Sequence, residues 1–233
     1  MTRRSFAGRP GPRSALVRRA LLIAGLFAPI FAVLFAAPPP AARAATPTSA
    51  PHAATTAAQA ARVWREAHER AILAEFAELL ALPNVASDTP NIERNVAALR
   101  AMLERRGLAV QVLRTGLAPP LLVADLPSTA RRARTLAFYA HYDGQPTDTL
   151  SWRGLPWTPV LRDARGHDVP LVGETPLDPE CRLYARSAGD DKASIMAMLV
   201  ALDALRAVKR TPVFHLRLVF EGEEEAGSPH LAD

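Results

Sequence analysis

The segment Tyr184–Lys192 places two adjacent carboxylates, Asp190 and Asp191, after a glycine and before an amphipathic helical pattern. Apolar residues then recur at the spacing of one helix face, at Ile195, Met198, Leu199, Leu202 and Leu205. One aspartate is expected here, because Asp is a favoured N-cap and its charge suits the positive end of the helix dipole. Capping requires only one carboxylate and does not explain the second. The pair therefore predicts a functional site if other polar side chains converge on it.

Two further groups of polar residues follow apolar stretches that are typical of strands. His141 and Asp143 come directly after the apolar run 135–140, and four glutamates in five positions follow the strand pattern 211–220. Ligands in open α/β sheets bind beyond the carboxyl ends of strands, so both groups stand where a site would form. Taken alone, the first group also fits an ordinary loop, and the second fits a solvated acidic turn.

The side chains in these groups suit a catalytic metal. A neutral imidazole is a good zinc ligand, and a nearby carboxylate commonly fixes its tautomer. Neighbouring carboxylates that face a pocket need metal ions or protons to relieve their repulsion, and one of them can then serve as a base. Nitrogen and oxygen donors without a thiolate favour zinc, cobalt or manganese in a hydrolytic site over a structural zinc.

The order of predicted elements favours an α/β fold with a largely parallel sheet. Apolar periodicity predicts helices over 55–82, 91–106 and 191–208 and strands over 108–113, 120–124, 135–140 and 211–220. The first helix gathers one apolar side from Val63, Ala67, Ile72, Phe76, Leu79 and Leu80. Strand 135–140 is almost wholly apolar, as in strands that are covered on both faces. The segment 144–182 reads mostly as loop, which predicts either a function or an insertion.

Arginine is concentrated in residues 1–44, which hold seven arginines and no acidic residue. Without them, 21 of the 28 basic residues are left against 23 acidic ones, a net charge of −2. Such a balance does not favour a nucleic-acid partner. Arg18-Arg19, the 17-residue apolar run 21–37 and Ala42-Arg43-Ala44 are typical of a secretory signal peptide. The run is shorter than the roughly 20 residues of a membrane span, although an uncleaved anchor is the alternative.

We therefore predict a signal peptide over 1–44, a flexible spacer over 45–56 and a catalytic region over 57–233. The protein is expected to be exported, as a periplasmic or secreted protein without stable membrane insertion after cleavage. Cys181 is the only cysteine, so an internal disulfide is excluded and a folded core must supply the stability.

Taken together, the three polar segments resemble the dinuclear zinc peptidases of clan MH, the carnosinase, aminoacylase and carboxypeptidase G group. That family shows an apolar strand, His-x-Asp, then Gly-Arg-Gly-x-x-Asp-x-Lys-Gly, then Glu-Glu before Gly-Ser. The segment Ala140–Pro146 is most similar to the dipeptidase branch, and Trp152 and Trp157 stand where that branch carries tryptophan. The resemblance covers residues 57–233 and implies the amino-terminal portion of a three-layer, phosphorylase/hydrolase-like sandwich with a mostly parallel central sheet flanked by helices.

The resemblance also implies a role for each matching residue. His141 would bind one metal ion, Glu225 would bind the other, and Asp190 would bridge both. Glu224 would be the general base, and Asp143 would orient His141. A cis peptide bond is implied between Asp190 and Asp191. The implied cofactor is a pair of Zn²⁺ ions, for which Co²⁺ or Mn²⁺ could substitute.

This chain departs from the family pattern in three respects. Ala185-Arg186-Ser187 replaces Gly-Arg-Gly, and Ala193 replaces the glycine after the lysine. The stretch 162–182 is longer than the family usually has. The resemblance further implies two more metal ligands and a lid and dimerisation domain beyond Asp233, so we expect these 233 residues alone to bind metal weakly and not to catalyse.

Three functions are compatible with these residues. The first is metal-dependent hydrolysis of peptide bonds in dipeptides or short peptides, and the second is hydrolysis of N-acyl amino acids at the same site. The third is a catalytically incomplete fragment or a binding module that keeps the fold. The resemblance implies a small peptide or N-acyl amino acid as the substrate and allows a homodimer through the lid.

Overall fold

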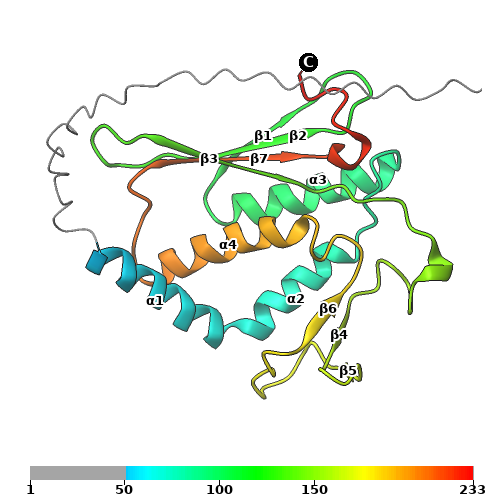
Figure 1. Ribbon diagram of the computed structural model, residues 1–233. Helices are drawn as coiled ribbons and strands as arrows, with labels where there is room; N and C mark the ends of the chain where they lie inside the picture. Colours follow the sequence, from blue (N-terminus) through cyan, green and yellow to red (C-terminus); the bar gives the residue numbers. More distant parts are fainter. Residues whose placement is uncertain (1–50, 233) are drawn as a thin grey trace, which may run out of the picture. The chain divides into compact units, whose positions relative to one another are not determined.

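The computed structural model describes residues 51–232, all of which belong to the unit Pro47–Asp233 (Figure 1). The predicted signal peptide lies outside the described residues, as does the first part of the predicted spacer. No helix within 51–232 combines the length and the apolar character that crossing a membrane requires.

Residues 51–232 form four α-helices: α1 (Pro51–Ala67), α2 (Glu69–Leu80), α3 (Thr89–Glu104) and α4 (Lys192–Ala207). The predicted helix 55–82 is therefore two helices that meet at His68, and α1 already begins within the predicted spacer. Val63 was predicted on the apolar side but is 60% exposed, whereas Phe76, Leu79 and Leu80 are buried. The break at His68 changes the direction of the chain, so only the side chains of α2 continue into the core.

Helix α3 corresponds to the predicted helix 91–106 and has one buried apolar face. Its inward side chains Ile92, Val96, Leu99 and Leu103 are all buried. Asp88 is the N-cap, and its carboxylate accepts a hydrogen bond from the backbone N–H of Asn91 at 3.3 Å. Gly107 stops the helix with a φ of +79°, a left-handed conformation that glycine adopts without steric cost.

The main sheet has the strand order β1-β2-β7-β3. Its strands are β1 (Ala109–Leu113), β2 (Leu121–Leu126), β3 (Thr135–His141) and β7 (His215–Glu221). Only β3 and β7 are parallel, while β1–β2 and β2–β7 are antiparallel, so the prediction of a largely parallel sheet is wrong for the described strands. The physical reason is connection length: residues 114–120 are too short for a parallel crossover, whereas the segment with α4 can make one between β3 and β7.

All four helices lie on the same side of this sheet (Figure 1). The apolar faces of α2, α3 and α4 meet Leu122, Ala124, Leu216, Leu218 and Phe220 of the sheet in one core. The predicted second helical layer is not found among residues 51–232. Strand β3 is an edge strand with Leu136, Phe138 and Tyr139 between 41% and 49% exposed, so the prediction that it is covered on both faces is also wrong for the described chain.

The predicted loop 144–182 contains a second, antiparallel sheet with the order β5-β4-β6. It is formed by β4 (Val160–Arg162), β5 (Asp168–Val169) and β6 (Arg182–Tyr184), and a short 3₁₀ helix η1 (Thr149–Ser151) precedes it. Arg70 of α2 donates to the backbone oxygens of Pro170 and Thr175 at 2.8 and 2.7 Å. These bonds tie the insertion to α2, and β6 leads directly into the segment that precedes α4.

An ion-pair network joins the helices on the far side of the core. The guanidinium of Arg106, only 6% exposed, donates to Glu75 at 2.9 Å and to Asp203 at 2.8 Å. Burial raises the pKa of Glu75, but Arg106 and Arg105 outweigh this and hold that pKa below its usual 4.5. The contacts connect α2, the end of α3 and α4, so they fix the packing of all three helices.

We expect Glu75→Gln to lower the free energy of unfolding at pH 7 by about 1–3 kcal/mol, because a buried guanidinium loses part of its charge compensation. The pKa of Glu75 is lowered in the folded state, so its contribution is present above about pH 4.5 and is lost as the pH falls further. The difference between the two proteins, measured by urea unfolding, should therefore shrink in acid. Glu104→Gln, which breaks the exposed pair with Arg100, is the control and should cost only about 0.3–0.5 kcal/mol. Equal effects of the two substitutions would contradict the prediction.

Candidate metal centre

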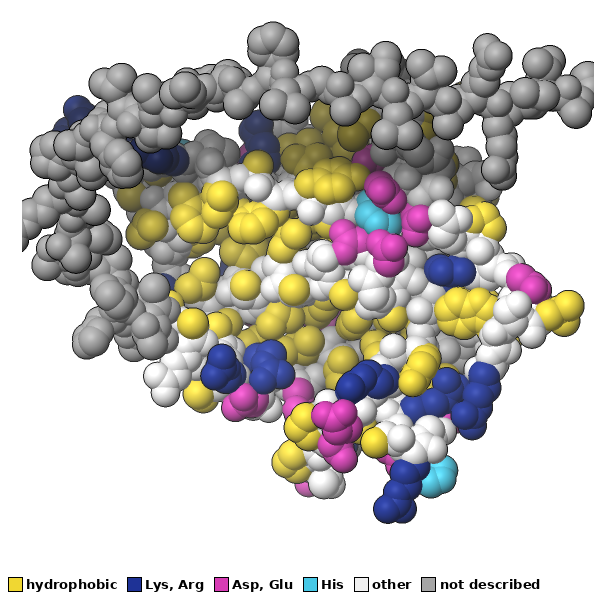
Figure 2. Space-filling view, in the orientation of Figure 1, with side chains coloured by type: hydrophobic (Ala, Val, Ile, Leu, Met, Phe, Trp, Pro, Cys, Tyr) yellow, Lys and Arg dark blue, Asp and Glu magenta, His cyan; other side chains and the backbone are white. Residues whose placement is uncertain are grey.

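Three segments that are distant in sequence meet at one end of the main sheet. Strands β3 and β7 are parallel with His141 paired to Glu221, so both chains leave the sheet at the same edge. Strand β7 leads into the short 3₁₀ helix η2 (Glu224–Ala226), and the turn before α4 brings Asp190 to the same place. Figure 2 shows acidic side chains gathered around a histidine on this face.

His141, Asp190 and Glu225 each offer a ligand atom, and these three atoms lie within 4.8 Å of one another. The Nε2 atom of His141 lies 3.0 Å from Oδ1 of Asp190. It also lies 3.6 Å from Oε2 of Glu224. The structure therefore brings the predicted ligands and the predicted base together, while their roles stay predictions.

His141 is 5% exposed and lies between carboxylates on both sides of its ring. Its Nδ1 atom is 3.3 Å from Oδ1 of Asp143, an ion-pair distance without good hydrogen-bond geometry. Burial lowers the pKa of His141, but Asp143 and Asp190 outweigh it and raise that pKa to about 9. The negative charge of the surrounding carboxylates favours positive charge at Nε2 of the imidazole, either from a proton or from a metal ion.

Asp143 makes contacts beyond the one that was predicted with His141. Its side chain is fully buried, and its two oxygens accept hydrogen bonds from the backbone N–H groups of Glu224 and Glu225, at 3.2 and 3.1 Å. Asp143 therefore also holds the first residues of η2 beside the histidine. The sequence contained no signal for this second contact, because Glu224 and Glu225 follow Asp143 in the chain by 81 and 82 positions.

Asp190 and Asp191 occupy different positions at the start of α4. Asp191 stands at the N-cap but makes no side-chain capping bond. The side chain of Asp190 is 81% exposed and points to His141. The peptide bond between the two aspartates is cis, which confirms what the family resemblance implied. Capping therefore does not account for the aspartate pair.

Two nearby residues were missed by the sequence reasoning. Gln145 donates from Nε2 to Oε2 of Glu225 at 2.7 Å, so it restrains one candidate ligand. Lys192 is fully buried, and its ammonium donates to the backbone oxygens of Leu79 and Leu82 at 2.9 and 3.2 Å. Burial lowers the pKa of Lys192 to about 7. Lys192 links the end of α2 to the first turn of α4, directly after Asp190 and Asp191.

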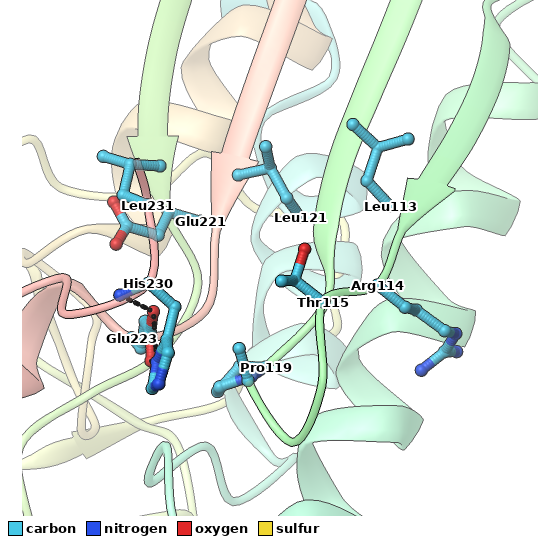
Figure 3. A pocket seen from close by; sticks show the side chains of 10 residues that line it. Leu113, Arg114, Thr115, Pro119, Leu121, Glu221, Glu223, His230 and Leu231 are labelled. Atoms are coloured by element: carbon cyan, nitrogen blue, oxygen red, sulfur yellow. Dashed lines mark hydrogen bonds and ion pairs between the residues drawn. The ribbon is translucent and has the colours of Figure 1, made fainter. Parts of the chain in front are cut away.

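The other acids of the glutamate run lie outside the candidate ligand set. Buried Glu221 accepts a hydrogen bond from the hydroxyl of Tyr139, while Glu223 accepts one from the backbone N–H of His230 at 3.0 Å. Figure 3 shows Glu223 and His230 across a pocket from Thr115 and Pro119 of the β1–β2 connection. His230 was not predicted as a metal ligand, and it does not belong to the candidate ligand group of His141, Asp190 and Glu225.

The donor set fits a divalent metal ion such as zinc. One imidazole nitrogen and two carboxylate oxygens are typical of catalytic zinc sites, and the Asp143 carboxylate behind the imidazole is the usual outer partner. Oxygen and nitrogen atoms within 4.8 Å of one another can all approach an ion at about 2 Å after small side-chain movements. The residues present therefore suit the group that the family resemblance implies.

Comparisons with known proteins agree with this geometry. Residues 137–233 match the model of Peptidase family M20/M25/M40. The human Beta-Ala-His dipeptidase is 32% identical over 118 residues, which cover 49% of this chain and 19% of the relative. The succinyl-diaminopimelate desuccinylase of Verminephrobacter eiseniae is 32% identical over 112 residues, which cover 47% of this chain and 24% of that enzyme.

A solved structure shows the same similarity in three dimensions. The crystal structure of human carnosine dipeptidase 1 aligns with a TM-score of 0.61 and 25% sequence identity. The alignment covers 73% of this chain and 36% of that structure. This chain thus spans about a fifth to a third of the length of the relatives that it matches.

Proposed function

We propose that this protein contributes the first part of a metal-dependent hydrolase site for dipeptides or short peptides, as the match of residues 137–233 to the model of Peptidase family M20/M25/M40 supports. The observation that carries the proposal is the convergence of His141, Asp190 and Glu225 beside the buried carboxylate of Asp143. Similarity to dipeptidases in sequence and in structure supports the substrate class.

Each residue of the site has a distinct task in the proposed reaction. Two Zn²⁺ ions bound here would polarise the scissile carbonyl and acidify a water molecule. Glu224, whose side chain is 44% exposed, would accept a proton from the water as it attacks the scissile carbonyl and return that proton to the nitrogen of the leaving amine as the amide bond breaks. Asp190 would supply a carboxylate ligand to the bound metal, and Asp143 keeps Nε2 of His141 directed at the site.

The remaining features of the proposal rest on the family resemblance. They are a second helical layer on the open face of the sheet, a lid domain that supports a homodimer, and two metal ions rather than one. Export rests instead on the signal-peptide pattern of residues 1–44. None of these features changes the roles proposed for the five residues that lie together in the structure: His141, Asp143, Asp190, Glu224 and Glu225.

Hydrolysis of N-acyl amino acids is the second candidate function. The observation that favours it is the desuccinylase, which matches this chain with the same 32% identity as the human dipeptidase. Both reactions cleave an amide bond and need the same metal ligands and base, so they differ only in the groups that contact the ends of the substrate. A panel of dipeptides and N-acyl amino acids, assayed with the complete gene product, distinguishes them by the ratio of kcat/KM values.

Metal binding provides the direct test. We expect calorimetric titration of the chelator-treated protein with Zn²⁺ to show binding that is lost in His141→Ala, because that substitution removes the only nitrogen donor of the described ligand group. His167→Ala is the matched control, since this exposed histidine contacts Asp163 in the insertion. Zn²⁺ binding that is unchanged by His141→Ala would contradict the proposed site.

A further inference from the structure

Asn84, in the loop between α2 and α3, lies at the junction of three segments around the candidate site. It is fully buried, and its Nδ2 donates to the backbone oxygen of Tyr142 at 2.8 Å and to Oγ of Ser187 at 2.9 Å. Its Oδ1 accepts from Nε1 of Trp157 at 3.1 Å. Both hydrogens and one acceptor site of the amide are therefore used, which fixes the side chain in one orientation.

Two of these bonds reach the segments that carry candidate metal ligands. Tyr142 lies between His141 and Asp143, and Ser187 lies three residues before Asp190. The backbone oxygen of Asn84 also accepts from the N–H of Gly144 at 2.9 Å, so the His141 loop is held at two points. One buried side chain thus connects the loop that carries His141 with the loop that carries Asp190.

Ser187 has a φ of +61°, a left-handed conformation that is uncommon for a residue with a side chain and that glycine adopts without steric cost. Its hydroxyl is the group that accepts the hydrogen bond from Asn84. Serine adopts this positive φ less readily than glycine would, but its hydroxyl provides a direct hydrogen bond to Asn84.

The two loops approach each other closely at this junction. A Cβ atom at Gly144 would lie 2.3 Å from Oγ of Ser187, closer than atoms tolerate, and a tight 3.1 Å from the amide of Asn84. Glycine at 144 is thus required by the contact between the loops. Packing does not restrain Asp190 itself, because 81% of its side chain is exposed, so its place depends on the backbone of its loop.

From this arrangement we propose that Asn84 is a positioning residue that sets the separation between His141 and Asp190, with Ser187 as its partner on the Asp190 loop. The inference rests on the proposed metal-dependent function. Metal sites tolerate displacements of only a few tenths of an ångström in their ligands, so a loop released from Asn84 would weaken the site without unfolding it.

The decisive variant is Ser187→Gly. It removes the hydroxyl and leaves one hydrogen of the buried Asn84 amide without its acceptor, while glycine adopts the positive φ without steric cost. A purely structural role for the bond therefore predicts a changed Tm and unchanged Co²⁺ binding. The positioning role predicts that Co²⁺ binding weakens by about 10-fold or more and that the visible spectrum of the bound Co²⁺ changes, as for loss of an outer partner of a metal site. Both quantities are measured on the same protein after chelator treatment.

Two further variants complete the experiment. Asn84→Asp keeps the shape of the side chain but replaces the donors by oxygens, and it should weaken Co²⁺ binding at least as much as Ser187→Gly. Asn95→Asp is the matched control: Asn95 is equally buried, and its Nδ2 donates to the backbone oxygens of Pro83 and Asn91, neither of which belongs to a segment that carries a candidate metal ligand. It should lower the Tm and leave the Co²⁺ spectrum unchanged.

The outcomes separate the inference from the proposed function. If the unsubstituted protein binds Co²⁺ and Ser187→Gly binds it equally tightly with the same spectrum, the positioning role is overturned and the metal site stands. If the unsubstituted protein takes up no Co²⁺, the proposed function is overturned and the positioning role with it. Should Asn84→Asp fail to fold, Ser187→Gly alone decides the question.

Discussion

Glu224→Gln in the complete gene product is expected to lose about 100- to 10,000-fold in kcat and to keep its metal. The carboxylate of Glu224 lies 3.6 Å from Nε2 of His141, at the edge of the candidate ligand group but outside it. Glutamine has nearly the same shape and cannot accept the proton of the attacking water, so the barrier rises by the contribution of a general base. Steady-state kinetics with a dipeptide, together with metal analysis of the purified variant, measure both effects.

Glu223→Gln is the matched control for this prediction. Glu223 is the preceding residue of the same acidic run, but its carboxylate accepts from His230 instead of facing His141. Its substitution should leave kcat nearly unchanged. An unimpaired kcat in Glu224→Gln, or an equal loss in both variants, would remove Glu224 from the role of base.

Asp190→Ala is expected to weaken Zn²⁺ binding by more than the roughly 10- to 100-fold that loss of an outer partner costs. The side chain of Asp190 reaches Nε2 of His141 at 3.0 Å and is one of three ligand-type groups in the cluster. Because this side chain is 81% exposed, its removal should change the Tm very little. Calorimetric titration and thermal unfolding of the same samples therefore separate loss of the metal from loss of the fold.

Asp191→Ala tests whether the effect belongs to one aspartate or to the pair. Asp191 stands at the N-cap of α4 without a side-chain capping bond, so its removal should change Zn²⁺ affinity much less than Asp190→Ala does. Reversed sizes of the two effects would assign the ligand role to Asp191 instead, and unchanged affinity in both would exclude the aspartate pair from the site.

Several elements of this fold follow from local sequence alone. The spacing of Ile92, Val96, Leu99 and Leu103 predicted the buried face of α3, because a helix with that period has one apolar side that must be covered. Leu216, Leu218 and Phe220 alternate along the predicted strand 211–220, and all three are buried in β7, as a strand with one covered face requires. The candidate residues at the strand ends were also predictable, since β3 and its His141 are adjacent in the chain.

Other features depend on contacts that no local pattern encodes. The period of β3 does not state whether it lies inside the sheet or at its edge, and the structure places it at the edge with Tyr139 49% exposed. The strands inside the predicted loop 144–182 are only two or three residues long, too short for a periodic signal. Their pairing is set by contacts with one another and by the bonds from Arg70.

The sequence by itself determined which chemical groups this protein can bring to a site: an imidazole, an aspartate pair and a run of glutamates, each next to a helix or strand with a clear period. Only the tertiary structure decided how these groups are held. Asn84 reaches Ser187 across 103 positions, and Asp143 reaches Glu225 across 82. The physical reason is that a hydrogen bond requires atoms within about 3 Å, and the packing of helices on the sheet, not spacing along the chain, brings those atoms together.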